Sequence, residues 1–401
     1  MNLKNVEGSF RTKANGTFEY RTYIDGKQKS FYGKSEAECL KKCRQYLIDY
    51  NREREEANVK ANHVTLENYA DYWLLTYKFG TVANSTYDRL ENSLNVHIKG
   101  SDLGQKELVD VTSDDIQQFI NEKKQTLSLS SLKKIKEILS PCLRYATASG
   151  LISSNPMELV VFPRNDKALT IKTKTIECYK DKEIERIALT ATYPYYKKNA
   201  KRYRYAPMFA FILNTGIRFG ECLALTWDDI DFVNKTISVN KTLSTVKNRD
   251  KDKDKRNKLQ VLSNPKTYNS TRILPMNKVA SDMLSEMKVR NSLSKINSNI
   301  VFPNYAGEHM NMRSVQETFS SICKDIGVEH KGIHALRHTF GSILVRNKVD
   351  IKVVSELLGH TDVKFTYNRY IHIINAQKAE AMNILNITPI LTENIRLSAQ
   401  G

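Results

Sequence analysis

The stretch LLGHTDVKFTYNRYIH, residues 357–372, places Tyr367 and Tyr370 between His360 and His372. Such a cluster has three interpretations. The tyrosines are an aromatic stripe of a core, the histidines bind a metal ion, or one tyrosine is a nucleophile assisted by the residues around it. The rest of the sequence decides among these interpretations.

The composition of the chain favours a nucleic-acid partner. Its 401 residues, 40% of them hydrophobic, are enough for two or three domains with real cores. The 62 Lys and Arg residues outnumber the 44 Asp and Glu residues, and the formal net charge of +18 is spread along the chain. This excess predicts a polyanionic partner. The longest apolar run, APMFAFIL at 206–213, is too short to span a bilayer, and the first residues lack a signal-peptide core, so a membrane is disfavoured.

The six cysteines are scattered and include no C-x-x-C pair, which is typical of a protein of the reducing cytoplasm. Cys39 and Cys43 have the spacing of half a metal site on a helix. No second pair of ligands lies nearby in the sequence. Packing on a helix face is therefore the favoured interpretation of these two residues.

Residues 1–60 are expected to form a three-stranded sheet covered by a helix. Asn15-Gly16 and Asp25-Gly26 are typical of two-residue hairpin turns. Ser35 predicts the start of the helix, with Glu38 as its capping partner. The strand TFEYRTYI alternates between two faces, one with Phe18, Tyr20, Thr22 and Ile24, the other with Glu19, Arg21 and Tyr23. The outer face lies in a DNA groove or is an ordinary solvated surface, and its basic residues are Lys13, Arg21, Lys27 and Lys29.

Residues 64–160 are expected to form a helical bundle. It follows the charged stretch NREREEANVKANH, which is interpreted as the fraying end of the first helix and a linker. Apolar residues recur at helical spacing in two segments: Leu66, Tyr69, Trp73 and Tyr77, then Tyr87, Leu90, Leu94 and Ile98. Further helices are predicted after Thr112 and through SLKKIKEILSPCLRYATASG, which ends at Gly150. The bundle's basic residues face DNA or solvent: Arg89, Lys133, Lys136 and Arg144.

Residues 170–401 are expected to form a mixed α/β domain. DKEIERIAL and APMFAFILNTGIRFGECLALTW are predicted helices, while KTISVNKTLSTV and TYNSTRILPM are predicted strands. The charged run KNRDKDKDKRNK, residues 247–258, is expected to be a solvated loop before it is a DNA-grasping finger. The predicted fold class is therefore multidomain and mainly α with small β-sheets.

Six of the eight histidines fall between 309 and 372, which is where a metal site would be sought. His330, His334 and His338 are spaced by fours, as zinc-binding histidines on a helix often are. The interval between His334 and His338, however, encloses Arg337 instead of the glutamate that a zinc hydrolase needs, and the charge of Arg337 opposes a dication. The sequence therefore predicts no metal and no other cofactor.

Cleavage of a DNA phosphodiester without metal needs a particular set of side chains. Negative charge gathers on the nonbridging oxygens in the pentavalent state, so two arginine forks are wanted. A lysine or histidine must protonate the leaving 5′-oxygen, and the nucleophile must lose a proton. A tyrosine nucleophile stores the bond energy in a phosphotyrosine link, so rejoining needs no ATP.

Four motifs supply this set in order. NTGIRFGECLAL at 214–225, HALRHTFGSIL at 334–344 and LLGHTDVKFTYNRYIH at 357–372 resemble the three signature boxes of the tyrosine recombinases, the phage-type integrases. NPKTYNSTRILPM at 264–276 is similar to the lysine hairpin of that family. The layout also looks like that of the integrases of conjugative transposons. That resemblance implies an arm-type DNA-binding domain, a core-binding domain and a catalytic domain with a carboxyl-terminal tail.

The resemblance implies a role for each matching residue. Arg218 and Arg337 clamp the scissile phosphate. Lys266 protonates the leaving 5′-oxygen. His334 assists proton transfer at the nucleophile, and His360 hydrogen-bonds a nonbridging oxygen.

The same resemblance chooses between the two tyrosines. In the family the nucleophile follows the third-box histidine by nine or ten residues and precedes a Y-x-H ending, which fits Tyr370 after His360. Tyr367 lies only seven residues after that histidine. With Phe365 and Val363 nearby, Tyr367 is expected to be a packing residue.

The implied activity is that of a site-specific recombinase that integrates and excises a mobile element. It is expected in the cytoplasm, as a homotetramer on double-stranded DNA with core-type and arm-type sites. The tail after Tyr370 is expected to dock on a neighbouring protomer or on its own domain, and an accessory excision factor is a further candidate partner.

Rival interpretations are a DNA-binding regulator with a degenerate recombinase fold, a dimer-resolving recombinase, a type IB topoisomerase and a metal-dependent nuclease. No catalytic residue type is missing, which argues against the regulator.

Overall fold

The structure, a computed structural model, describes residues 8–13, 16–24, 27–59, 64–163, 177–193, 200–249, 257–263 and 271–382. Contacts divide the chain into two compact units, Met1–Thr175 with Thr245–Leu259, and Ile176–Ser244 with Gln260–Gly401. Helices predominate and the sheets are small, which confirms the predicted fold class. No described helix is long and apolar enough to cross a membrane. The finer boundary between residues 1–60 and 64–160 stays a prediction.

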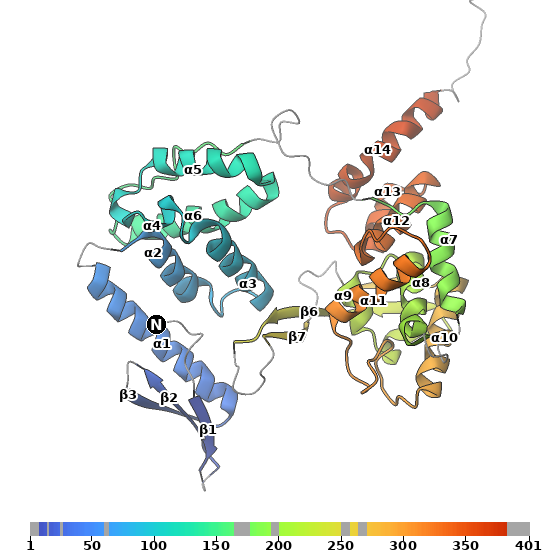
Figure 1. The fold of residues 1–401 in the computed structure, drawn as a ribbon, viewed down its shortest axis with the longest axis horizontal. Helices are drawn as coiled ribbons and strands as arrows, with labels where there is room; N and C mark the ends of the chain where they lie inside the picture. Colours follow the sequence, from blue (N-terminus) through green and yellow to red (C-terminus); the bar gives the residue numbers. More distant parts are fainter. Residues whose placement is uncertain are drawn as a thin grey trace, which may run out of the picture. The chain divides into compact units, whose positions relative to one another are not determined.

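The amino-terminal sheet is antiparallel, with the strand order β1 (Gly8–Thr12), β2 (Phe18–Ile24) and β3 (Lys27–Gly33). Helix α1 (Glu36–Val59) lies across one face of this sheet (Figure 1). The Ser35 hydroxyl accepts the Glu38 N–H (3.2 Å), which confirms the predicted helix start. Cys39 and Cys43 are buried against the sheet, as expected for packing residues. Of the predicted turn residues only Gly16 is described, and its φ is +78°.

The outer face of this sheet differs from the prediction at Glu19. Its side chain is buried (2% exposed), because Arg21 and Tyr32 fold over it. The Tyr32 hydroxyl donates to the carboxylate at 2.9 Å, and the hydrogen bond from Arg21 lowers the Glu19 pKa to about 2. The charge of Arg21, whose side chain is 38% exposed, is therefore offset by Glu19, so this face is less positive than its sequence indicates.

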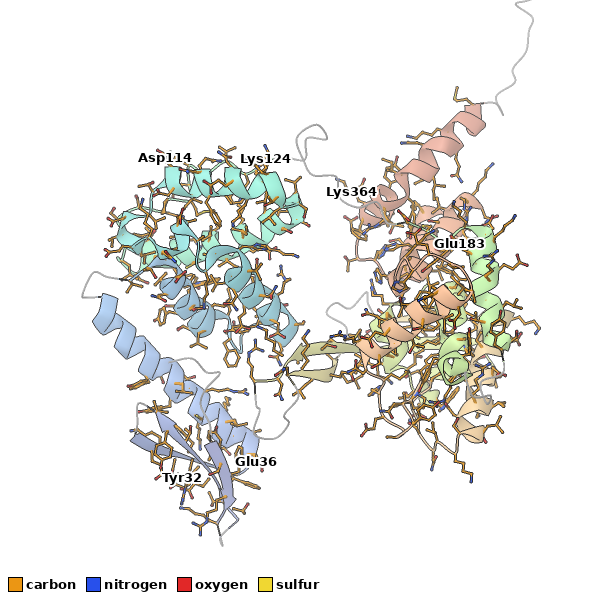
Figure 2. All side chains as sticks on the ribbon, viewed as in Figure 1. Tyr32, Glu36, Asp114, Lys124, Glu183 and Lys364 are labelled. Atoms are coloured by element: carbon orange, nitrogen blue, oxygen red, sulfur yellow. The ribbon has the colours of Figure 1, made fainter. Side chains whose placement is uncertain are left out.

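The helical part of the first unit follows the predicted periodicity. Its apolar residues at helical spacing, apart from the half-buried Tyr77, form one buried core. The Thr112 side chain and Asp115 form a reciprocal cap that begins α5. Asp114 lies in the first turn of α5 and Lys124 in its last, so each complements the helix dipole (Figure 2). The helical segments are α2 (Leu66–Trp73), η2 (Leu74–Lys78), α3 (Asn84–Ser93), η3 (Leu94–Ile98), α4 (Asp102–Gln105), η4 (Leu108–Asp110), α5 (Ser113–Thr126) and α6 (Leu129–Ala148).

The start of the charged run at 247–258 packs instead of being solvated. It follows β6 (Thr242–Lys247), which pairs with β7 (Lys258–Ser263). Lys247 and Arg249 both form ion pairs with Glu91 on α3, at 2.7 and 3.1 Å. The prediction of a solvated loop is therefore wrong for these first residues, while residues 250–256 lie outside the described ones.

The second unit is built around α8 (Ala206–Thr215), which is almost wholly buried because its sequence is apolar on every side. The predicted long helix is broken after α8 by Gly216, whose φ is +64°. A small antiparallel sheet has the order β4 (Ile230–Asp231), β5 (Thr236–Val239) and β8 (Arg272–Pro275). The other helical segments (Figure 1) are α7 (Asp181–Leu189), η5 (Thr190–Thr192), η6 (Ala200–Tyr205), α9 (Phe219–Ala224), η7 (Trp227–Asp229), α10 (Lys278–Leu293), α11 (Met312–Asp325), α12 (Ile333–Arg346), α13 (Ile351–Leu358) and α14 (Val363–Met382).

Candidate active site

The three boxes of the sequence meet at the carboxyl end of α13. Arg218 precedes α9, and Arg337 lies on α12. Arg218 Nη2 donates to the Gly359 carbonyl (2.6 Å), and Arg337 donates to the Leu358 carbonyl. Because the last carbonyls of a helix lack helical partners and carry partial negative charge, guanidinium groups are stabilised there.

Arg218 is held in place by Glu221, one turn along α9. The buried Glu221 carboxylate accepts the Arg218 backbone N–H (3.0 Å) and its Nη1 group (2.7 Å). Burial opposes the charge of Glu221, but hydrogen bonds from Arg272 and Arg218 lower its pKa. The Arg218 side chain remains 33% exposed. It is therefore fixed at one edge and open to a ligand at the other.

Arg337 is buried more deeply, with 3% exposure. Its Nη1 group donates to the Gly216 carbonyl at 2.7 Å. Burial and the nearby Arg218 lower its pKa to about 9, so the guanidinium stays charged at neutral pH. The structure thus places two fixed cations side by side from separate segments.

His360 forms a hydrogen bond with the guanidinium of Arg337. Its Nε2 lies 3.1 Å from Arg337 Nη2, and its Nδ1 lies 2.7 Å from the Thr366 hydroxyl. Burial and Arg337 lower the His360 pKa to about 3, so the ring is neutral. Since a guanidinium only donates, Nε2 accepts from Arg337 and Nδ1–H donates to Thr366. Both ring nitrogens are occupied here, and the expected contact with a phosphate oxygen stays a prediction.

His334 and His338 lie beside each other on α12, with ring centroids 5.1 Å apart. His334 is exposed at its surface, but the protein around the ring displaces part of its solvent. This desolvation, together with Arg337, lowers its pKa. His338 is buried, which lowers its pKa to about 3. His330 packs its ring against Phe319 instead of facing the other two. Among the described residues no group of three His, Cys, Asp or Glu side chains is arranged to hold a metal ion.

Tyr370 is buried, with 2% exposure, and packs in a small core with Val345, Val354 and Leu358. Its hydroxyl has no hydrogen-bond partner within the part of the chain that the structure describes. Burial raises the pKa of Tyr370 to about 12, and Arg337 acts in the opposite direction. The hydroxyl is therefore neutral and needs a base or added positive charge to become a nucleophile.

Tyr367 is not part of the small core in which Tyr370 packs, and the packing role expected for it stays a prediction. Tyr367 is half-buried, while Phe365 is 49% and Val363 38% exposed. The side chain of α14 that enters the core is that of Tyr370. The period of the helix explains the difference, because Thr366 and Tyr370 share the buried face and Tyr367 is rotated away from it.

Two residues of the site were missed by sequence reasoning. Arg272 forms a fork with Glu221, through Nη2 to Oε2 (2.9 Å) and Nη1 to Oε1 (3.2 Å). Gly341 lies against Tyr370, and a methyl group on it would overlap the tyrosine hydroxyl. Both stand inside the quoted motifs, but a lone arginine or glycine does not reveal its spatial partner. Lys266 lies outside the described residues.

Two of the basic residues expected to face DNA from the amino-terminal sheet, Lys13 and Lys29, lie over aromatic rings. Lys13 Nζ lies 4.3 Å from the Tyr32 ring centroid, and Lys29 Nζ lies 5.2 Å from that of Tyr46. The Lys27 side chain lies outside the described ones. These ammonium groups are near enough for cation–π attraction, and their contact with DNA stays a prediction.

The basic residues expected on the helical bundle are mostly exposed. Arg89 forms an ion pair with Glu137 at 2.5 Å. Lys136 Nζ lies 4.5 Å from a ring centroid, that of Phe162. Lys133 and Arg144 are exposed on α6. All four are available at the surface, which fits a DNA-facing side as well as a solvated one.

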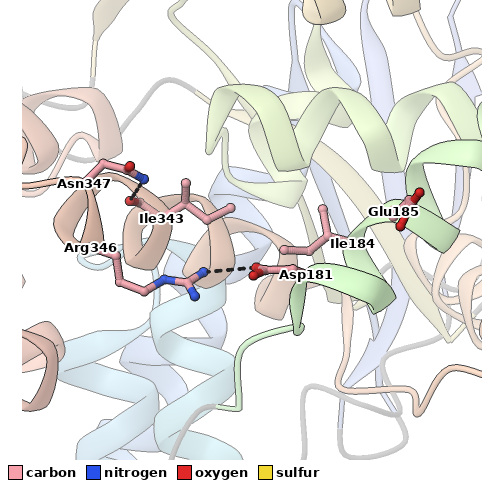
Figure 3. A pocket seen from close by; sticks show the side chains of 6 residues that line it. All are labelled: Asp181, Ile184, Glu185, Ile343, Arg346 and Asn347. Atoms are coloured by element: carbon pink, nitrogen blue, oxygen red, sulfur yellow. Dashed lines mark hydrogen bonds and ion pairs between the residues drawn. The ribbon is translucent and has the colours of Figure 1, made fainter.

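A shallow pocket lies between α7 and α12, apart from Arg218 and Arg337. Figure 3 shows Arg346 reaching toward Asp181 (3.6 Å), and Ile184 and Ile343 also line the pocket. Asn347 caps its own helix by donating to the Ile343 carbonyl at 2.8 Å. None of the residues predicted for the site lines this pocket.

Known proteins are similar in sequence to this chain. The phage integrase family model matches residues 178–377, and the model of the phage integrase N-terminal SAM-like domain matches residues 65–138. A tyrosine recombinase XerC-like protein of Caldanaerobacter subterraneus subsp. tengcongensis is 30% identical over 372 residues, which cover 90% of this chain and 91% of the relative. The chain belongs to the phage integrase family, the tyrosine recombinases. It is a tyrosine site-specific recombinase, as the motifs predicted.

Solved structures share its fold. The Tn1549 transposon integrase in complex with a circular intermediate DNA superposes with a TM-score of 0.63 at 19% identity, covering 79% of this chain and 99% of that one. A lambda integrase tetramer bound to a Holliday junction gives a TM-score of 0.53 at 17% identity, covering 92% and 95%. The ICEBs1 integrase of Bacillus subtilis is 24% identical over 337 residues, 82% of this chain and 84% of the relative. The resemblance to conjugative transposon integrases is thereby confirmed.

Proposed function

We propose that this recombinase cuts and rejoins DNA through a 3′-phosphotyrosyl link at Tyr370, and so moves an integrative mobile element into and out of a chromosome. The observation that carries the proposal is the meeting of Arg218 and Arg337 at the end of α13. Arg337 is also near enough to Tyr370 to lower its pKa against the effect of burial. Two fixed cations and a tyrosine nucleophile are what metal-free cleavage of a phosphodiester requires.

In the proposed step the Tyr370 oxygen attacks the phosphorus and the bond to the 5′-oxygen breaks. Arg218 and Arg337 hold the nonbridging oxygens. The tyrosine proton passes to His334, whose lowered pKa keeps it neutral and able to accept at pH 7. Lys266 gives a proton to the leaving 5′-oxygen. Rejoining is the reverse reaction with another 5′-hydroxyl, and neither metal nor ATP enters the balance.

The proposed partner is double-stranded DNA, with core-type and arm-type sites, bound by a homotetramer. Recombination of two duplexes needs four strand cleavages and hence four tyrosines. The lambda integrase tetramer on a Holliday junction supports the tetramer by analogy, and the Tn1549 integrase in complex with a circular intermediate DNA supports the DNA partner. Residues 383–401 lie outside the described ones, and their docking on a neighbouring protomer is part of the proposal. An accessory excision factor is left open.

The test is trapping of the intermediate on a duplex of the element's junction, nicked so that the cleaved fragment diffuses away. The native protein and Tyr367→Phe are expected to form a covalent adduct that survives denaturation, in chelator as well as without it. Tyr370→Phe is expected to form none. An adduct with Tyr370→Phe, or one that disappears in chelator, would overturn the proposal.

A further inference from the structure

Glu221 is shared by two arginines. Its Oε1 accepts from Arg218 Nη1 (2.7 Å) and Arg272 Nη1 (3.2 Å). Its Oε2 accepts from the Arg218 backbone N–H (3.0 Å) and from Arg272 Nη2 (2.9 Å). Arg272 thus makes the two-toothed contact with this carboxylate, while Arg218 uses only one guanidinium nitrogen on it.

These two arginines and Arg337 donate to three successive backbone carbonyls at the end of α13. Arg272 Nε donates to Leu357 (3.1 Å), Arg337 to Leu358, and Arg218 Nη2 to Gly359 (2.6 Å). These hydrogen bonds fix Arg272 to the same helix end as Arg218 and Arg337, the two residues predicted to clamp the phosphate. The three guanidinium groups are therefore positioned as a unit.

Gly359, the residue that ends α13, packs closely against the Arg272 side chain. Gly359 has φ +62°, a left-handed conformation that ends the helix. A side-chain carbon added to it would lie 2.9 Å from Arg272 Nη1 and 3.0 Å from Cδ and Cζ. The absence of that carbon leaves room for the Arg272 guanidinium against the backbone.

Arg272 and Arg218 differ in the exposed fraction of their side chains, which indicates different roles. The Arg272 side chain is 8% exposed and Glu221 5%, whereas Arg218 is 33% exposed. Arg272 therefore faces the protein, and Arg218 faces outward. In this cluster of described side chains, three positive charges meet one negative charge, so Arg272 offsets Glu221 and leaves the charges of Arg218 and Arg337 for a substrate.

We propose, resting on the proposed function, that Arg272 is a positioning residue: it binds Glu221 and thereby directs Arg218 toward the scissile phosphate. When the phosphoryl group gains negative charge in the pentavalent state, an uncompensated Glu221 would repel it and draw Arg218 back. The site keeps two net positive charges with Arg272 and one without it. Arg272 acts through Glu221 and Arg218 and does not touch the DNA.

The experiment measures single-turnover adduct formation by the full chain on the nicked junction duplex. One substrate has the natural scissile phosphate and the other a methylphosphonate, which lacks one charged oxygen. Arg272→Gln is expected to lose roughly 100-fold on the phosphate, the scale of a misplaced catalytic group. The loss should shrink on the methylphosphonate, because less negative charge has to be stabilised.

A neutral pair supplies the second variant. Glu221→Gln with Arg272→Gln keeps hydrogen-bonding amides and the same net charge as the native cluster. It should cleave at least roughly tenfold faster than Arg272→Gln alone, a coupling of ordinary size for contacting residues. If Arg272→Gln fails to fold, this double variant, compared with the native protein on both substrates, decides the question.

Arg290→Gln is the matched control. Arg290 is another buried arginine that pairs with a glutamate, Glu286 (2.6 Å), and donates to the Tyr203 carbonyl (2.6 Å). Its loss should reduce stability without changing the ratio of phosphate to methylphosphonate rates. Native rates with Arg272→Gln, or equal loss on both substrates without relief by Glu221→Gln, would overturn the inference. Failure of the native protein to form any Tyr370 adduct would instead overturn the proposed function.

Discussion

The hydroxyl of Tyr370 lies against Gly341, in a space that any side chain at position 341 would fill. Gly341→Ala is therefore expected to lower stability by about 1–3 kcal/mol, the usual cost of overpacking a core. The measurement is the free energy of unfolding by denaturant. In a Tyr370→Ala background the same substitution should become neutral or stabilising, because alanine is the better helix former. A loss that stays the same in that background would show that the tyrosine is not the cause.

The buried hydroxyl of Tyr370 has a cost for folding. Among the described residues it has no hydrogen-bond partner, so Tyr370→Phe is expected to raise the free energy of unfolding by about 1 kcal/mol. Tyr367→Phe, at a half-buried position, should stay within about 0.5 kcal/mol of the native value. Thermal or denaturant unfolding of the two variants checks this. Equal changes at both positions would contradict the burial of the Tyr370 hydroxyl.

Much of this site could be predicted from the order of its motifs. Arg218 and Arg337 meet as expected, although more than a hundred residues separate them, because the resemblance carries the family's spatial arrangement with it. Helix periodicity likewise predicted the core of the helical bundle. Both signals depend on residue types that repeat or recur in a fixed order.

What sequence could not predict was the choice of partners. Glu19 alternates onto the polar face, but Arg21 and Tyr32 cover it, and no periodicity encodes that. Arg249 stands in a charged run that resembles a solvated loop, yet its acidic partner lies on a helix far earlier in the chain. Such pairings depend on tertiary contacts between charges, which the local pattern does not specify.

Neutral His338 makes the protein sensitive to acid. Its folded pKa is lowered by burial to about 3, below the ordinary value of 6.5, so the unfolded chain binds a proton between these values and the folded chain does not. The stability from this group is fully present above pH 6.5 and is lost as the pH falls toward 3. The loss is about 1.4 kcal/mol for each pH unit in that window. His360 has a similarly lowered pKa and keeps its own share of the slope. His338→Gln should therefore reduce, but not abolish, the dependence of unfolding free energy on pH between 6.5 and 5, and an unchanged slope would contradict it.

Arg249 holds the segment after β6 onto α3. Its guanidinium pairs with Glu91 (3.1 Å) and lies 4.7 Å from the Tyr87 ring centroid, and the arginine side chain is only 21% exposed. Arg249→Ala is expected to weaken this packing by about 1–2 kcal/mol, between the values for surface and buried pairs. The measurement is trypsin cleavage within residues 247–258, which should be faster in Arg249→Ala than in the native protein. Salt on the order of 1 M should speed cleavage of the native protein too. Arg89→Ala is the control, because that arginine on the same helix is 42% exposed in its pair with Glu137, and its loss should leave cleavage unchanged. Equal cleavage of the native and Arg249→Ala proteins at low salt would show that the ion pair does not hold the segment.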